Sequence, residues 1–299
     1  MSAPKILIIT PAKNEAEFIG ETIASMTAQT VRPTRWIIVD DGSTDGTAEI
    51  VEKAGLEHPW IGLVRREGTK VRRVGPGVIE AFYEGLSHAR LEDYDFVCKL
   101  DADLRFRPEY FAILMKRFEE NPRLGTASGK SWNLVGDKLV EERTHDQMSN
   151  GQAKLYRREC FQEIGGFVHE VMWDGIDCHR CRMLGWESAS FRDPELVLTH
   201  LRQMGSSFRS IYHGRMRWGY GQYFMGTHPL YALGISVYRM FERPWVLGGL
   251  CILAGYCKAW LERRPRYNDL AFRKFLRRWQ MQELARRFFG GRSQQVPTA

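Results

Sequence analysis

The sequence predicts an α/β protein with a single, mainly parallel sheet flanked by helices and a helical extension at the C-terminal end. Two observations support this fold class. Over residues 6–100, short apolar runs alternate with stretches of helical periodicity, which is typical of parallel sheets covered on both faces. After residue 230 the pattern changes to long apolar and basic helical stretches. We therefore expect a catalytic or binding domain at 1–230 and a helical extension at 231–299.

The apolar runs place the strands in order along the chain. Strands are expected at 6–10, 36–39, 61–65 and 96–100. Apolar side chains spaced three and four residues apart predict the helices between them, at 15–29, 47–54 and 78–89. Beyond Pro108, the pattern predicts a helix to about 119, short strands at 126–128 and 153–156, and a helix at 176–184.

Charge is unevenly distributed along the 299 residues. The chain carries 43 Lys and Arg against 36 Asp and Glu, but residues 258–299 hold eleven of these cations and only three acids. The rest of the chain is therefore nearly neutral, which argues against a nucleic-acid-binding protein.

Cysteine content and the N-terminal residues indicate the expected compartment. Six cysteines in a chain of this length do not form a disulfide framework and indicate reduced thiols. The apolar run at 6–9 is too short for a signal-peptide core, which needs about 7–15 residues. We expect a cytoplasmic protein.

Polar residues follow three of the four expected strands, at 10–15, 40–45 and 101–103. The carboxyl ends of parallel strands meet at one edge, where open α/β sheets bind their ligands. Asp101 and Asp103 in this position offer the hard oxygen ligands that suit Mg²⁺ or Mn²⁺. Asp40 and Asp41 can accept hydrogen bonds from a base or a ribose. These clusters predict a binding site for a phosphorylated ligand.

Three motifs together resemble the signature of glycosyltransferase family 2. They are ILIITPAKNE at 6–15, IIVDDGSTDGT at 37–47 and DADL at 101–104, and the resemblance covers about residues 4–200. It implies the Rossmann-like A-type nucleotide-diphospho-sugar transferase fold (GT-A). It also implies an inverting, metal-dependent transfer of a sugar from a nucleotide-diphosphate donor, with a UDP-sugar as the first choice, to an acceptor hydroxyl.

The resemblance also implies which residues form the site. The nucleoside pocket would be lined by Thr10, Pro11, Asn14, Glu15, Asp40 and Asp41. The Mg²⁺ or Mn²⁺ ion would lie on Asp103, assisted by Asp101 and by the late histidine His200. A basic residue of the glycine-rich loop would contact the nucleotide, and Lys70, Arg72 and Arg73 all remain open, with Arg73 preferred.

Asp174 matches the position of the family's catalytic base. It precedes Arg180 by six residues and follows a Gly-Gly-Phe turn, as the family pattern requires, although Trp173 stands where the family usually has Glu. Asp177, one helical turn later, is the alternative base. The other interpretation of both aspartates is that they favour a helix N-terminus electrostatically.

Two other function classes fit the sequence less well than a transferase does. A catalytically idle nucleotide- or lipid-binding scaffold of the same fold would be favoured if the carboxylates at 101, 103 and 174 were absent, but all are present. A nucleotidyltransferase would need a glycine-rich loop directly after the first strand, and 11–15 contains no glycine. Gly214 stands where processive synthases have Gln, which favours a non-processive enzyme. We expect the enzyme to act in cell-surface polysaccharide or glycolipid synthesis.

The C-terminal extension carries features of a membrane-surface segment. The uncharged apolar stretch at 245–257 is shorter than the roughly 20 residues that span a bilayer, and cations flank it. Aromatic and cationic side chains in such a stretch favour peripheral contact with an anionic membrane, here at the inner face of the cell membrane, and a lipid-linked acceptor. The alternative is a helix packed on the catalytic domain.

Overall fold

The computed structural model describes the chain except residues 1–3, 67–74, 136–137, 203–210, 243 and 290–299. The chain divides into two compact units, Met1–Met204 and Gly205–Ala299. The expected boundary at residue 230 differs from this division. It falls inside a helix, Pro229–Arg239, of the second unit. The reason is that the preceding helix, Ile211–Met225, packs against later helices of the second unit.

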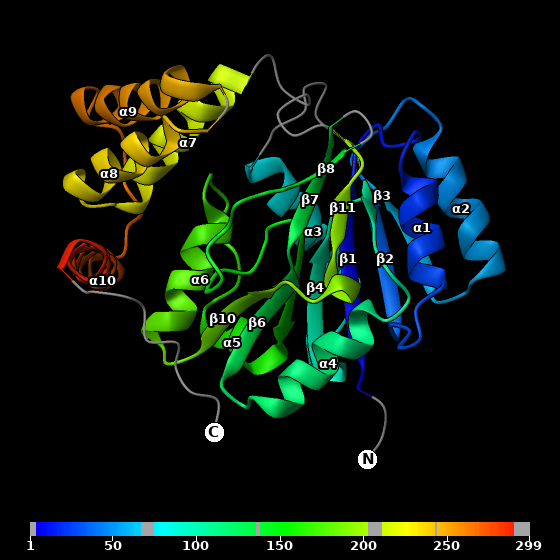
Figure 1. Cartoon of the computed structure of the whole chain (residues 1–299). Helices are drawn as coiled ribbons and strands as arrows, with labels where there is room; N and C mark the ends of the chain where they lie inside the picture. The colour runs from blue at the N-terminus through cyan, green and yellow to red at the C-terminus, as the bar shows by residue number, and fades with distance from the viewer. Residues whose placement is uncertain (1–3, 67–74, 136–137, 203–210, 243, 290–299) are drawn as a thin grey trace. The chain divides into compact units, whose positions relative to one another are not determined.

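A seven-stranded sheet forms the centre of the first unit, with the order β10-β6-β9-β4-β1-β2-β3 (Figure 1). Its strands are β1 (Ile6–Ala12), β2 (Arg35–Asp40), β3 (Ile61–Arg65), β4 (Phe96–Leu100), β6 (Leu124–Gly129), β9 (Ala153–Arg157) and β10 (Glu187–Phe191). Strands β4, β1, β2 and β3 run parallel, and β9 runs antiparallel to both its neighbours. The predicted mainly parallel sheet is confirmed.

Helices cover both faces of this sheet because its central strands are apolar on both faces. On β1, Ile6 and Ile8 belong to one core, and Leu7 and Ile9 belong to the other; all four are fully buried. The first core includes residues of α1 (Ile19–Thr27), α2 (Thr47–Glu57) and α4 (Tyr110–Glu120). The second includes residues of α3 (Pro76–Ser87), α5 (Arg158–Glu163) and α6 (Trp173–Met183).

A second, four-stranded sheet with the order β5-β11-β7-β8 adds to the expected architecture. Its strands are β5 (Leu104–Arg105), β11 (Leu198–His200), β7 (Ser131–Val135) and β8 (Lys138–Glu141). Strand β11 pairs antiparallel with β5, which sets His200 opposite Leu104. This pairing brings a late segment of the chain beside the residues that follow β4.

The described part of the second unit contains four helices: α7 (Ile211–Met225), α8 (Pro229–Arg239), α9 (Trp245–Leu261) and α10 (Leu270–Phe289). Helices α7 and α9 approach closely through glycines. A Cβ built on Gly219 would lie 1.9 Å from the carbonyl oxygen of Ile252, and one built on Gly255 would lie 2.1 Å from that of Met216. Within the described ranges, none of the helices combines the length and apolar character needed to cross a bilayer.

Candidate active site

The loops that follow β1 and β2 are joined by hydrogen bonds at the carboxyl edge of the sheet. Asn14 donates its backbone N–H to the hydroxyl of Ser43 (2.9 Å), and its side-chain oxygen accepts from the N–H of Thr44 (2.9 Å). Asn14 has a φ of +53°, a left-handed conformation that Asn tolerates better than most residues. The two sequence motifs at 10–15 and 40–45 therefore form one continuous surface.

Asp41 lies on this surface between two cations. Nε of Arg66 is 3.3 Å from its Oδ1, and Nζ of Lys13 is 3.8 Å from its Oδ2 and donates to the Asp41 carbonyl (2.7 Å). Burial raises the pKa of Asp41, and the two cations partly oppose that shift. Within the described residues, Oδ1 of Asp41 has no aligned hydrogen-bond donor. This oxygen is also buried, so Arg66 is the neighbour that compensates its charge.

Three other residues of the expected nucleoside pocket lie at different depths. Thr10 is fully buried, and its hydroxyl accepts a hydrogen bond from the indole N–H of Trp36 (2.8 Å), so its side chain supports the sheet beneath the edge. Asp40 is also buried, and its Oδ1 accepts from the N–H of Ser43 (3.1 Å). Pro11 is partly exposed.

A network of charged side chains joins the ends of β1, β4 and β11. Arg202 pairs with the carboxylate of Glu15, and its Nε lies 3.4 Å from Oδ2 of Asp103. Nε2 of His200 lies 3.2 Å from the same Asp103 oxygen. Burial opposes ionisation of Asp103, but His200 and Arg202 outweigh it and hold the pKa of Asp103 below its usual value. The sequence placed Asp103, His200 and Glu15 in the site separately, and the structure brings them together.

Asp101 stands in a different environment from Asp103. Its carboxylate pairs with Lys99 of β4, and Lys99 also donates to the carbonyl of Gly151 (2.9 Å). Burial raises the pKa of Asp101, with Lys99 acting against the shift. The ammonium of Lys99 also lies 5.2 Å from the ring centre of Trp173. Lys99 therefore connects the Asp-Ala-Asp motif to the start of α6.

The carboxylate oxygens of Asp101 and Asp103 and the imidazole nitrogen of His200 are suitable ligands for Mg²⁺ or Mn²⁺. Within the described residues, no three acidic, histidine or cysteine side chains are arranged to hold a cation by themselves. Such ions usually take one or two carboxylates and complete their coordination with waters and substrate phosphates. The Asp103–His200 contact of 3.2 Å offers an oxygen and a nitrogen at one point, so the residues suit an ion that a diphosphate helps to hold.

Asp174 lies in the first turn of α6, which begins after Met172 in a left-handed conformation (φ +63°). Its side chain is partly exposed, and a Cβ built on Gly151 would lie 2.9 Å from its Oδ2, so a larger residue at 151 would displace the Asp174 carboxylate. Burial raises the pKa of Asp174, the nearby Asp177 adds to the shift, and Lys154 acts against it. A carboxylate with a raised pKa is suited to accept a proton.

Asp177 is unlike Asp174 because it is fully enclosed. Its carboxylate pairs with the ammonium of Lys154 (2.5 Å) and accepts a hydrogen bond from the hydroxyl of Tyr156. Neither Lys154 nor Asp177 exposes any of its side chain. Lys154 also donates to the backbone carbonyl of Asp174 (2.8 Å). Asp177 therefore belongs to the support beneath Asp174.

Sequence reasoning missed Lys99, Lys154 and Arg66. The signal for the first two was available, because a lysine inside an otherwise apolar strand needs a buried partner to remain charged. Arg66 follows β3 and had no such signal. Arg73, like Lys70 and Arg72, lies outside the residues that the structure describes.

Comparison with known proteins identifies relatives of the first unit. The sequence model of the family described as glycosyl transferase family 2 matches residues 7–173. The poly-beta-1,6-N-acetyl-D-glucosamine synthase of Staphylococcus aureus (strain COL) is 28% identical over 124 residues, which are 42% of this chain and 28% of that protein. The corresponding synthase of Staphylococcus epidermidis is 30% identical over 116 residues, 39% of this chain and 26% of that protein. These matches thus span less than a third of the relatives' length.

Two solved structures share the fold. The mannosyltransferase PcManGT of Pyrobaculum calidifontis, in complex with GDP-Man and Mn²⁺, aligns with a TM-score of 0.57 and 20% identity over 95% of this chain and 81% of that one. S. aureus TarS 1-349, in complex with UDP-GlcNAc, aligns with a TM-score of 0.52 and 17% identity over 91% and 78%. The family match covers more than half of the chain and contains the motifs at 10–15, 40–45 and 101–103. The chain belongs to glycosyl transferase family 2, and its expected GT-A fold is confirmed.

Proposed function

We propose that the enzyme moves a sugar from a nucleotide-diphosphate donor to an acceptor hydroxyl, with inversion and by a single displacement. The observation that carries this proposal is the charge network of Glu15, Arg202, Asp103 and His200 at the carboxyl edge of the sheet. It presents a guanidinium, which matches phosphate oxygens, next to a carboxylate that favours a cation.

The nucleoside half of the donor is assigned to the surface around Asp41. The Asp41 carboxylate would accept a hydrogen bond from the base, while Lys13 and Arg66 oppose the rise in its pKa that burial causes. Asn14 and Pro11 complete this surface beside it. A UDP-sugar is the first donor to test, because TarS is described in complex with UDP-GlcNAc, and GDP-Man, the ligand of PcManGT, is the second.

A divalent ion is proposed on Asp103, Asp101 and His200. When bound, such an ion supplies Lewis-acid stabilisation of the negative charge on a leaving diphosphate. Arg202 would orient the same diphosphate through its guanidinium and is itself held by Glu15. The complex of PcManGT with GDP-Man and Mn²⁺ supports this arrangement by analogy of fold.

Asp174 is proposed as the general base. The acceptor O–H would lose its proton to the Asp174 carboxylate as the oxygen attacks the anomeric carbon and the bond to the diphosphate breaks. Asp177 cannot reach an acceptor, because it is completely buried and engaged by Lys154 and Tyr156. Its proposed part is structural.

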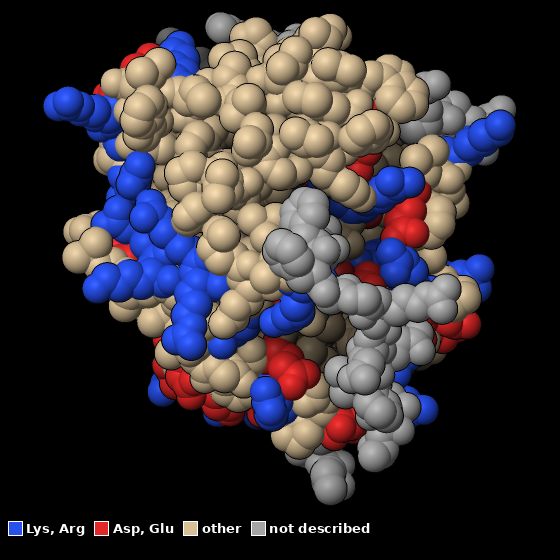
Figure 2. Space-filling view, turned by 60° about the vertical axis from the view of Figure 1, so that its left-hand side comes forward, with Lys and Arg blue, Asp and Glu red and all other residues tan. Residues whose placement is uncertain are grey.

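The helical unit is proposed to contact an anionic membrane surface, which suits a lipid-linked acceptor and a place in surface polysaccharide or glycolipid synthesis. Large apolar side chains on α8 and α9 are exposed: Leu230, Leu233, Val237, Tyr238, Val246, Leu247, Leu250, Trp260 and Leu261. Figure 2 shows a broad face without charged side chains, bordered by Lys and Arg. Apolar surface with cations at its border is typical of proteins that lie on anionic membranes.

Thermal melting of the full chain tests donor and metal together. UDP-, GDP- and dTDP-sugars are compared with and without Mn²⁺, on the wild type, on Asp103→Ala and on Glu57→Ala, which removes an exposed acid of α2 as a control. At a hundredfold excess over Kd, a donor adds about 2.7 kcal/mol to the free energy of unfolding, or several degrees in Tm.

We expect one nucleotide class to raise the Tm of the wild type and of Glu57→Ala only with Mn²⁺, and to leave Asp103→Ala unchanged. A donor that stabilises Asp103→Ala as much as the wild type would refute the metal site. Failure of every nucleotide sugar to shift any variant would refute the proposed donor class.

A further inference from the structure

Asn133 lies in the middle of strand β7, beside His200 of β11. The two strands pair in parallel, and their register sets Asn133 opposite His200. On its other side, His200 is opposite Leu104 of β5, a fully buried apolar residue whose side chain offers the imidazole no hydrogen bond. Asn133 is therefore the polar one of the two cross-strand neighbours of His200.

The imidazole of His200 has a partner at each ring nitrogen. Its Nδ1 lies 3.4 Å from Oδ1 of Asn133, and its Nε2 lies 3.2 Å from Oδ2 of Asp103. Because an amide oxygen only accepts, the contact with Asn133 is a hydrogen bond in which Nδ1–H of His200 donates. Held in this way, the ring turns Nε2, and not Nδ1, toward Asp103.

The fold alone does not explain an asparagine at this position. Asn133 stands between Trp132 and Leu134 in a strand of five residues. Asparagine is depleted in strands, where β-branched and aromatic residues fit better, because its side chain competes for backbone hydrogen bonds. The contact with His200 gives the Asn133 amide a role that an apolar strand residue could not fill.

Histidines that bind metal ions usually donate their second ring N–H to a fixed oxygen, which orients the ring and sets the nitrogen that faces the ion. Oδ1 of Asn133 is such an oxygen for His200. We propose that Asn133 is a positioning residue of the cation site, which holds His200 so that Nε2 is presented to Mg²⁺ or Mn²⁺ beside Asp103. The inference rests on the metal site proposed above, because Asn133 acts through His200.

Binding of Mn²⁺ to the full chain tests this inference without turnover. The electron paramagnetic resonance signal of free Mn²⁺, measured with UDP or GDP present, gives the bound fraction. Asn133→Val removes the acceptor oxygen and suits a strand, and Asn133→Asp keeps an acceptor oxygen. Asn121→Val is the matched control, because Asn121 also accepts a hydrogen bond, from the N–H of Arg123 (2.9 Å), but precedes the amino end of β6.

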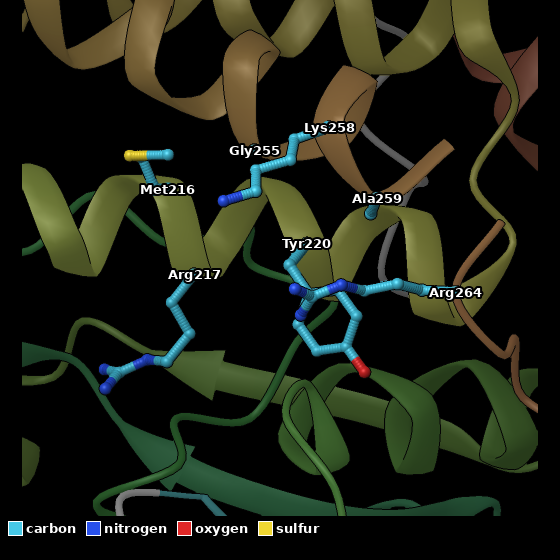
Figure 3. A pocket seen from close by; sticks show the side chains of 7 residues that line it. All are labelled: Met216, Arg217, Tyr220, Gly255, Lys258, Ala259 and Arg264. Atoms are coloured by element: carbon cyan, nitrogen blue, oxygen red, sulfur yellow. The ribbon is translucent and has the colours of Figure 1, made fainter. Parts of the chain in front are cut away.

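The signal is assigned to the proposed site with His200→Ala, since the binding that this variant removes depends on the imidazole. The helical unit offers the ion no competing ligands in its pocket. That pocket, between α7 and α9 (Figure 3), is lined by Arg217, Lys258 and Arg264 and, among the described residues, by no acidic or histidine side chain.

We expect Asn133→Val to weaken Mn²⁺ binding about 10–100-fold, the usual cost of removing the outer partner of a metal-binding histidine. Asn121→Val keeps the affinity of the wild type, and Asn133→Asp keeps or exceeds it. In the His200→Ala background, Asn133→Val has no further effect, because no imidazole is left to orient. Asn133→Ala repeats the test if valine lowers the urea midpoint of the protein.

Three results overturn this inference and leave the metal site standing. In the first, His200→Ala weakens Mn²⁺ binding and Asn133→Val does not. In the second, Asn133→Val weakens it equally with and without His200, as a purely structural residue would. In the third, Asn133→Asp binds Mn²⁺ as weakly as Asn133→Val.

A different result overturns the metal site itself. If neither His200→Ala nor Asp103→Ala changes Mn²⁺ binding, the proposed site fails together with the role of Asn133. Sugar transfer that persists in excess EDTA would then leave the proposed transferase activity standing without the ion.

Discussion

Replacing Lys154 with Met tests the support beneath the proposed base. Lys154 and Asp177 form a fully buried ion pair, and Lys154 is also the donor to the backbone carbonyl of Asp174. Lys154→Met keeps the approximate volume and length of the side chain but removes the charge and the donor. Asp177 is then left as a buried carboxylate that still accepts hydrogen bonds from the Tyr156 hydroxyl and the Cys178 N–H but has lost its counter-charge.

The expected loss of stability follows from these contacts. Removing one partner of a buried ion pair costs about 3–5 kcal/mol, because the other charge stays buried without compensation. Loss of the hydrogen bond to the Asp174 carbonyl adds about 1 kcal/mol. The double variant Lys154→Met/Asp177→Asn removes both charges and keeps an acceptor for Tyr156, so most of the stability should return.

Activity should not return with stability. Both variants lack the donor to the Asp174 carbonyl, so the first turn of α6 is held less firmly, and a misplacement of about 1 Å can lower a rate about a hundredfold. Loss of Lys154 also removes the cation that lowers the pKa of Asp174. Because a general base must be ionised, the acid limb of the pH–rate profile should move to higher pH in Lys154→Met.

Urea unfolding followed by circular dichroism gives the stability, and steady-state kinetics across pH give kcat, KM and the acid limb. The result that refutes the reasoning is a Lys154→Met variant with the urea midpoint of the wild type. A double variant that recovers both stability and kcat would show that Lys154 does not position Asp174.

Three further predictions concern other parts of the chain. Asp174→Asn should keep donor affinity but lose about 10²–10⁴ in kcat, as expected for a general base; an equal loss of donor affinity in titrations would identify a binding residue instead. Asp41→Asn should raise the KM for the nucleotide sugar more than it lowers kcat, and unchanged KM would remove Asp41 from the pocket. Gly255→Ala should lower the urea midpoint of the helical unit by an amount equivalent to about 1–3 kcal/mol, because its Cβ meets the Met216 carbonyl oxygen. The control Gly214→Ala, with no atom within 4 Å of its Cβ, should stabilise α7 slightly, and equal effects of the two would refute the close packing of α7 on α9.

The sheet and its site edge were predictable because they depend on local patterns. The apolar runs that form β3 (Ile61–Arg65) and β4 (Phe96–Leu100) match the predicted strands at both ends. Polar residues directly after β1, β2 and β4 then meet at one edge by the geometry of parallel strands. Loops that follow neighbouring parallel strands therefore contact each other, as the hydrogen bonds between Asn14 and residues 43–44 illustrate.

The second sheet and the unit boundary were not predictable in the same way. Strand β8 (Lys138–Glu141) is largely exposed and lacks an apolar face, so neither periodicity nor burial distinguishes it from a loop. Helix α7 carries three glycines and little amphipathic pattern, because its packing on α9 uses backbone contact instead of an apolar stripe. The sequence therefore gives little indication that the first unit ends at residue 204.

The contacts within the site could not be predicted from the sequence, because its charge pairs join residues that lie far apart in the chain. Arg202 lies 187 residues from Glu15 in the chain. The pairing of β11 with β5, together with the hydrogen bond from the Leu201 N–H to the Asp103 carbonyl (2.9 Å), brings Arg202 and His200 to the Asp-Ala-Asp motif. As a result, Asp101 and Asp103 have different charged neighbours and their pKa values shift in opposite directions.

Asp103 receives His200 and Arg202, so its pKa is lowered, whereas burial dominates at Asp101 and raises its pKa. Asp103 therefore stays ionised as the pH falls below the ordinary aspartate value, and the stability it gains from its partners is lost only when the pH falls through its lowered pKa. His200, whose pKa Asp103 raises against the opposing effect of burial, loses its share as the pH rises through that raised value. Between these limits Asp103 is ionised, so a fixed anion stands at the strand end where a donor diphosphate and its cation are proposed to bind, and His200 would release its proton before its imidazole could hold that cation.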